Sequence, residues 1–234
     1  AQFDSAFHPT YDSSNDDVIV PCFTSHVVKR VSFRGRVNTY AGISGTPGSN
    51  DAMTILATFN GPCSTAIASD GTVYIGDYTG GRIRSITPGG SVTFVAGSTD
   101  GFNDASGASA QFHKPTGLAV SNDDLKVYVA ERLGHRVRTV TLAGAGVLTL
   151  AGDGTAGNID GFITRFNRPE SCVLDASGSN LYVAEQLSFL VRKVVTATGF
   201  SAAFAGTGAV GTSDGVGVNA NLTEPKNIAV TSDG

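Results

Sequence analysis

Acidic and basic side chains recur at a fixed spacing along this chain, and their types could carry chemistry. An acid ends an apolar run and an arginine follows seven residues later in three pairs: Asp77 and Arg84, Glu131 and Arg138, and Glu185 and Arg192. A ring of carboxylates on one rim could bind a cation or a basic ligand. An acid and a base that flank one hairpin, however, pair with each other. We therefore interpret the three pairs as structural acid–base pairs.

Two glycine-rich segments, residues 152–157 and 206–211, match the Gly-x-Gly-x-x-Gly pattern of phosphate-binding loops. That pattern binds a nucleotide where the loop follows a strand and opens a helix of a βαβ unit. Both segments follow an apolar run, but no helical pattern comes after either of them. We interpret them as copies of one structural loop, so the sequence predicts neither a nucleotide site nor a cofactor.

Metal binding and nucleophilic catalysis lack the residue patterns that they need. The Asp-Gly pairs that begin at Asp100, Asp160 and Asp214 are typical of tight turns. Calcium takes about 6–8 oxygen ligands, more than Asp100 supplies together with Asn103 and Asp104. No His-x-x-x-His or Gly-x-Ser-x-Gly spacing occurs among the residues. The sequence therefore predicts no metal site, no catalytic residue and no enzymatic activity.

Three cysteines and one sequon complete the chemically interesting residues. Cys22 stands where the other repeats have the acid, and Cys63 directly follows Pro62, so both are expected at one rim of the fold. A disulfide between them is one expectation and two free thiols are the other; a disulfide would indicate an oxidising compartment. Asn221 begins the single Asn-x-Ser/Thr sequon and is an expected N-glycosylation position, unless the match arises by chance.

An internal repeat of 53 to 56 residues positions all of these side chains. Its register is given by five prolines, Pro9, Pro62, Pro115, Pro169 and Pro225. Ala-Gly pairs and strand tyrosines follow the same period. The repeats cover approximately residues 9–61, 62–114, 115–168 and 169–224, with a partial repeat at 225–234. We treat residues 1–234 as one domain built from these units.

One period contains four short strands and no long helical pattern. In the repeat that starts at Pro115, strands are predicted over residues 117–120, 127–131, 136–140 and 147–151. Each unit is therefore a four-stranded antiparallel meander. Such a small sheet cannot bury both faces by itself, whereas radial stacking of about 4–8 copies forms a β-propeller. The predicted fold class is all-β, with a β-propeller of four-stranded blades.

The repeated pattern resembles the NHL repeat in its longer form. Ala-Gly, Asp-Gly, Phe-x-x-Pro, Val-Tyr-Val-Ala-Glu and Arg-Val-Arg follow one another, and residues 134–138 are nearest to the segment that names the family. The resemblance covers nearly the whole chain and implies a propeller, which in this family usually closes with about six blades. We therefore expect the chain to be a fragment, an arc of a larger ring. The alternative is a small closed ring in which the last strand completes the first blade.

Composition limits the classes of function. Glycine contributes 30 of 234 residues, charged residues make up 15%, and the net charge is −4. The negative net charge does not favour binding to nucleic acid. The sequence contains no apolar run of about 20 residues, so it does not predict membrane insertion. Since NHL propellers host protein binding, RNA binding and a few enzymes, the resemblance alone does not fix an activity.

The predicted function is that of a non-catalytic scaffold or adhesion module, extracellular or at the cell surface. It would bind protein or glycan through propeller loops on one face, because the repeat explains every motif and leaves no catalytic residue. One alternative is a structural subunit of a surface appendage or fibril that self-assembles through open blade edges. A second alternative is a metal-dependent hydrolase or lyase of the NHL superfamily.

Overall fold

The computed structural model describes residues 3–231 and contains four four-stranded antiparallel sheets, which we call blades 1 to 4. Blade 1 comprises β1 (Thr10–Asp12), β2 (Asp17–Cys22), β3 (Val27–Ser32) and β4 (Val37–Ala41). Blade 2 comprises β6 (Pro62–Ile67), β7 (Val73–Asp77), β8 (Arg82–Ile86) and β9 (Ser91–Gly97), and the short β5 (Ala52–Met53) pairs with the edge of β9.

The second half of the chain repeats this arrangement. Blade 3 comprises β10 (Pro115–Val120), β11 (Lys126–Glu131), β12 (Arg136–Thr141) and β13 (Gly146–Ala151). Blade 4 comprises β14 (Pro169–Leu174), β15 (Asn180–Glu185), β16 (Leu190–Val195) and β17 (Ser201–Ala205). The helical elements of the described residues are three single 3₁₀ turns, η1 (Thr54–Leu56), η2 (Gly107–Ser109) and η3 (Gly217–Asn219). None of them is long enough to cross a membrane.

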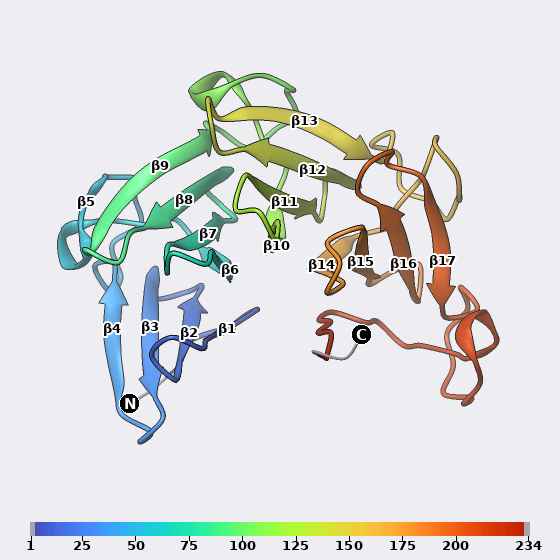
Figure 1. Ribbon diagram of the computed structural model, residues 1–234, viewed down its shortest axis with the longest axis horizontal. Coiled ribbons are helices and arrows are strands. Elements are labelled where there is room, and N and C mark those ends of the chain that lie inside the picture. The colour runs from blue at the N-terminus through green and yellow to red at the C-terminus, as the bar shows by residue number, and fades with distance from the viewer. Residues whose placement is uncertain (1–2, 232–234) are drawn as a thin grey trace.

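The blades radiate around a central axis, so the prediction of an all-β propeller is confirmed (Figure 1). The first strand of each blade lies toward the centre and the fourth lies at the outside. In Figure 1 the arc is open between blade 1 and the segment that follows β17. Blade 1 is built from β1–β4 alone, so the alternative of a small closed ring, in which the last strand completes the first blade, does not hold for residues 3–231.

The apolar core lies between consecutive blades. Phe59, Phe112 and Phe166, the phenylalanines of the Phe-x-x-Pro segments, are fully buried in successive copies of this core. The other core side chains come from the strands. Alternate strand residues point to opposite faces of the sheet, so one set packs on the preceding blade and the other on the following blade. Each blade is therefore stabilised mainly by its neighbours, and the axial ends of the strands stay available for a site.

Candidate functional site

Two of the three predicted acid–base pairs are brought together in the space between blades. The Oε1 atom of Glu131 accepts a hydrogen bond of 2.7 Å from Nη1 of Arg138, and the Oε1 atom of Glu185 accepts one of 2.6 Å from Nε of Arg192. All four side chains are fully buried. Burial raises the pKa of Glu131 to about 7, although Arg138 opposes that change. These groups hold the fold together and are closed to a ligand.

The third predicted pair, Asp77 with Arg84, is wrong. Arg84 instead forms an ion pair of 2.6 Å with Asp51, and Oδ1 of Asp77 accepts a hydrogen bond of 2.6 Å from the backbone N–H of Asn60. Aspartate is one methylene shorter than the glutamates at the same position, so its carboxylate stays near the backbone. Oδ2 of Asp77 is buried without a partner among the described residues, and burial raises the pKa of Asp77 to about 7.

A second set of aspartates, in the long loops, makes contacts that the sequence analysis did not assign. Each pairs with the buried arginine of the following blade: Asp51 with Arg84, Asp104 with Arg138, and Asp160 with Arg192. Each also accepts a hydrogen bond from a backbone N–H of an outermost strand, that of Phe94, Thr149 or Ala203. We call this arrangement of loop aspartate, buried arginine and strand edge the loop clasp.

The expected disulfide between Cys22 and Cys63 is not formed, since both thiols and that of Cys172 are free and buried. The Sγ atom of Cys63 donates a hydrogen bond of 3.1 Å to the carbonyl of Pro115 in blade 3, so it faces away from blade 1. Burial raises the pKa of the Cys63 thiol above its usual range and that of Cys172 to about 12. Without the disulfide, the extracellular localisation stays a prediction.

The glycine-rich segments are filled turns. In residues 152–157, Oδ1 of Asp153 accepts a hydrogen bond of 2.7 Å from the N–H of Thr155, and Oδ2 accepts one of 2.8 Å from Nε of Arg165. Gly152 has φ +99°, and a Cβ there would lie 2.5 Å from the carbonyl oxygen of His135. Glycine is therefore needed for the turn itself. Among residues 3–231, no three His, Cys, Asp or Glu side chains lie close enough to hold a metal ion.

Asn221 has a structural role in the loop after blade 4. Its side-chain amide donates hydrogen bonds of 2.7 Å to Oγ1 of Thr207 and 3.2 Å to the carbonyl of Ala209. The hydroxyl of Thr223, the third sequon residue, donates to the carbonyl of Gly211 at 3.0 Å. Both sequon side chains thus bind the loop backbone, and N-glycosylation of Asn221 stays a prediction.

A concave pocket lies at one end of the central axis and is the best candidate for ligand binding. We call it the axial pocket; it has a volume of 360 Å³ and contains Phe7, Phe23, Tyr78, Arg132 and Glu170. Ligand pockets usually measure about 300–1,000 Å³ and combine apolar walls with a few polar groups. The residues come from all four blades and the segment before β1, so only the folded arc brings them together.

Aromatic rings form one wall of the axial pocket. The ring centroids of Phe7 and Phe23 lie 5.8 Å apart, and those of Phe23 and Tyr78 lie 5.6 Å apart, both edge-to-face. The ammonium group of Lys114 lies 5.2 Å from the Tyr78 centroid. Edge-to-face packing restrains each ring against its neighbour, so this wall is a preformed apolar surface.

Charged groups of Arg132 and Glu170 form a polar wall of the pocket, and an amide supports it. Nε of Arg132 donates to Oε1 of Glu170, and Nη2 of Arg132 donates to Oε1 of Gln186 at 3.2 Å. The amide of Gln186 in turn donates to Glu224 at 3.1 Å. Glu170 is buried and its second oxygen has no hydrogen-bond partner among the described residues. The wall therefore offers planar donors and acceptors whose positions are fixed by each other.

The sequence analysis missed these residues although it carried a signal for them. Phe23, Tyr78, Arg132 and Gln186 occupy one repeat position, directly after the end of the second strand. The preceding position is acidic in three repeats, whereas this position changes from aromatic to charged to amide. This position lies beside the axis and varies between otherwise similar repeats. Its side chains are therefore the ones expected to contact a ligand.

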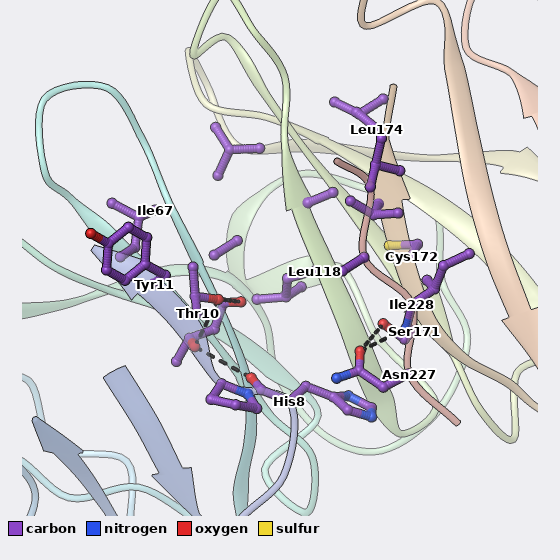
Figure 2. Close-up of a pocket in the computed structure, with 18 of the residues that line it drawn as sticks. His8, Thr10, Tyr11, Ile67, Leu118, Ser171, Cys172, Leu174, Asn227 and Ile228 are labelled. Carbon is purple, nitrogen blue, oxygen red and sulfur yellow. Dashed lines mark hydrogen bonds between the residues drawn. The ribbon is translucent and has the colours of Figure 1, made fainter. Parts of the chain in front are cut away.

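A second cavity of 410 Å³ follows the axis and is lined mainly by the first strands of the blades. Figure 2 shows its apolar side chains, including Ile67, Leu118 and Ile228, and the hydrogen bond of 2.9 Å between Ser171 and Asn227. His8 lines both cavities, and its Nδ1 lies 2.9 Å from the carbonyl oxygen of Thr116. This second cavity contains fewer charged side chains than the axial pocket, so it offers a ligand fewer polar contacts.

Repeated four-stranded blades around an axis, with a pocket at its end, define a β-propeller. No protein-family model matches the chain. The chain is 26% identical over 167 residues to "NHL repeat-containing protein 2" of Bos taurus, a match that covers 65% of this chain and 23% of that protein. The relatives of Gallus gallus and Homo sapiens with the same name are 26% and 25% identical. With the four blades, these relatives support the resemblance of the chain to NHL-repeat propellers.

Two solved structures show the same fold. An auxiliary nutrient binding protein from Bacteroides ovatus superposes with a TM-score of 0.62 at 18% identity, covering 97% of this chain and 64% of that protein. A streptogramin B lyase superposes with a TM-score of 0.60 at 12% identity, covering 87% of this chain and 55% of that protein. The chain thus spans 23% of the length of its first relative and about half to two-thirds of these structures.

Proposed function

We propose that this protein is a non-catalytic binding module that takes a glycan in the axial pocket. One observation carries the proposal: the aromatic rings of Phe7, Phe23 and Tyr78 line the same pocket of 360 Å³ as the charged groups of Arg132 and Glu170. A sugar ring presents C–H groups on its faces and hydroxyl groups at its edge. The first would pack on the aromatic rings, and the second would bond to planar guanidinium and carboxylate groups.

The position of the pocket supports binding to an end of a glycan chain. Its lining residues come from all four blades, so a ligand that enters contacts the four blades together. The likeness to a nutrient-binding propeller agrees with a binding role, although it extends to the fold alone. Binding of a protein loop at the same face is the other candidate, because an extended peptide also combines apolar and polar groups.

The protonation of Cys63 and the ion pair of Glu170 support the proposed absence of catalysis. Cys63 lines the pocket, but burial raises the pKa of its thiol, and the neutral thiol is a poor nucleophile. Glu170 is held by Arg132, which fixes the carboxylate as an ion-pair partner. In this proposal Cys63 and Glu170 therefore form part of the pocket wall and do not act as nucleophile or base.

An array of neutral and acidic oligosaccharides, followed by calorimetric titration of each hit, tests the proposal with the intact chain. We expect at least one oligosaccharide to bind, and Phe23→Ala and Arg132→Met each to weaken that binding at least tenfold. Leu148→Ala is the control, because Leu148 is 64% exposed on blade 3 and does not line the pocket. Absence of binding across the array, or equal binding by all variants, would refute the assignment. Turnover of a bound oligosaccharide would refute its non-catalytic part.

A further inference from the structure

Two histidines share one repeat position, the last residue before the third strand of a blade. His26 directly precedes β3, and His135 directly precedes β12. Blade 2 has Gly81 and blade 4 has Phe189 at the same place. All four residues have a positive φ, between +50° and +60°. The backbone of this turn is therefore the same in every blade, and only the side chain differs.

Both histidines reach across an internal junction to the backbone of the next blade. Nδ1 of His26 accepts a hydrogen bond of 3.1 Å from the N–H of Gly61, and Nδ1 of His135 accepts one of 3.3 Å from the N–H of Arg168. Gly61 and Arg168 are equivalent residues, since each comes directly before a register proline. A backbone N–H can only donate, so Nδ1 is the unprotonated nitrogen of a neutral imidazole in both bonds.

The residues that donate these bonds also hold the axial pocket. The carbonyl of Gly61 accepts a hydrogen bond of 3.0 Å from the N–H of Tyr78, whose ring lines the pocket. The carbonyl of Arg168 accepts one of 2.9 Å from the N–H of Gln186, whose side chain accepts a hydrogen bond from Arg132. Each histidine is therefore connected to the pocket through the backbone of a single residue.

Protonation of either imidazole removes its bond across the junction. Histidine ordinarily titrates at about pH 6.5, and the protonated ring is a donor at both nitrogens. The new N–H at Nδ1 would face the backbone N–H, so repulsion between two donors replaces the hydrogen bond. Both histidines are half-buried, so solvent protons can reach them.

Cationic groups face His135 from three elements. Burial, and then the charges of His113, Arg168 and Arg136, lower the pKa of His135. His113 comes from the loop before β10, Arg168 from the residue before β14, and Arg136 from β12 itself. The acid of this turn, Glu131, is occupied by its buried ion pair. An imidazolium at this point would therefore be repelled from both blades of the third junction.

The surroundings of His26 carry less charge. Residues 42–45 and 60–61 pack against its turn and contain no charged side chain. The acid of the facing blade, Asp77, binds the N–H of Asn60, which is adjacent to Gly61. Loss of the hydrogen bond, more than repulsion between charges, is therefore the expected effect at His26.

We propose that the axial pocket is acid-sensitive, and that His26 and His135 are the positioning residues that hold it in shape at neutral pH. Protonation releases the two N–H groups that they bind, and with them Tyr78 and Gln186. The second junction has Gly81 at this position and no bond of this kind to lose. Release of the backbone is a property of the chain alone, whereas weaker ligand binding in acid rests on the proposed function.

Asparagine is the matched replacement for both histidines. Its Oδ1 atom occupies the place of Nδ1 and accepts a hydrogen bond at every pH, and asparagine tolerates a positive φ. The double variant His26→Asn with His135→Asn should therefore keep both bonds in acid. His135→Phe removes the acceptor, and Phe189 shows that this turn accommodates the ring.

Amide hydrogen exchange of the intact chain at pH 7.5 and pH 5.5 tests the release without a ligand. Corrected for intrinsic exchange rates, protection of the Tyr78 and Gln186 amides should fall at least fivefold in acid for the wild type and less than twofold for the double asparagine variant. The Arg132 amide, bound at 3.0 Å by the carbonyl of Lys114 in the second junction, is the internal reference and should not change. Equal losses in wild type and double variant, or no loss in either, would overturn the proposal.

Calorimetric titration with a bound oligosaccharide at the same two pH values measures the consequence for the pocket. The wild type should lose at least fivefold in affinity in acid, and the double asparagine variant less than twofold. His113→Asn is the control, because it removes an imidazole that binds neither N–H, and it should lose affinity like the wild type. Equal acid weakening in wild type and double variant would overturn the role of the histidines while the glycan assignment stood. Failure of every oligosaccharide to bind would refute the glycan assignment, and the exchange measurement would then decide the role of the histidines by itself.

Discussion

Two adjacent positions at the end of the second strand have opposite roles. The acids Glu131 and Glu185 point between blades and are fully buried, whereas of the next residues Arg132 lines the axial pocket and Gln186 accepts a hydrogen bond from it. The first position is acidic in three of the four repeats, whereas the second changes its chemistry in every repeat. In this propeller, what the repeats share builds the scaffold, and what distinguishes one repeat from the next builds the pocket.

The largest effect that separates scaffold from pocket is expected at the repeat phenylalanine. Phe112→Ala should lower the free energy of unfolding by about 3–5 kcal/mol, because a fully buried ring leaves a cavity between blades 2 and 3. Chemical denaturation measures this loss. Phe162→Ala, at a ring that is 71% exposed, should change stability by less than about 0.5 kcal/mol. Similar losses for the two variants would contradict the division of roles.

A comparison of two clasp arginines sharpens the role of the buried acid. Arg138→Met should cost about 3–5 kcal/mol, since it leaves the buried Glu131 carboxylate without its partner. Arg84→Met should cost clearly less, because its partner Asp51 has a side chain that is 46% exposed and can be hydrated. Urea titrations of both variants at pH 7.5 give the difference. An equal or larger loss at Arg84 would show that the acid of the second strand is not the decisive partner.

The pH dependence of stability tests the unpaired acid of blade 2. The pKa of Asp77 is raised by burial to about 7 in the folded state, so between about pH 4 and pH 7 the folded protein holds a proton that the unfolded chain releases. Stability from this group is therefore present at low pH and falls as the pH rises toward 7, by on the order of 1 kcal/mol per pH unit.

The variant Asp77→Asn isolates that contribution. The wild type should lose stability relative to Asp77→Asn as the pH rises from 4.5 to 7.5, as measured by urea unfolding at each pH. Glu131 also titrates in this window, but it is present in both proteins and cancels in the difference. A difference that does not change with pH, or that changes in the opposite direction, would refute the assigned protonation of Asp77.

The smallest expected effect on stability lies in the pocket. Tyr78→Phe removes a hydroxyl that accepts a long hydrogen bond of 3.4 Å from Arg132 and should change the free energy of unfolding by less than about 0.5 kcal/mol. In the proposed function it should still weaken binding of the selected oligosaccharide severalfold. Calorimetry and thermal melting of the same sample compare the two effects. A large loss of stability with unchanged binding would place Tyr78 with the scaffold.

The loop clasp shows why part of the fold was predictable and part was not. Glu131 and Arg138 are seven residues apart on paired strands, so a hairpin brings them together from local pattern alone. The loop aspartates Asp51, Asp104 and Asp160 follow their Ala-Gly glycines by nine, seven and eight residues. Because loop length varies, their shared position exists only once the loop has folded against the next blade. The Asp77 error had a similar origin, since the length of one side chain decided which partner was reached.

The sequence by itself determined the period, the four strands of each blade and hence a propeller, because strand alternation and turn residues are local properties that survive repetition. Tertiary structure alone decided where the thiols of Cys22 and Cys63 point, which aspartate each arginine binds, and that Phe23, Tyr78 and Arg132 share one pocket. These residues lie about one repeat apart, and only the curvature of the arc brings their shared position to the axis. That curvature arises from packing between blades, which no single repeat encodes.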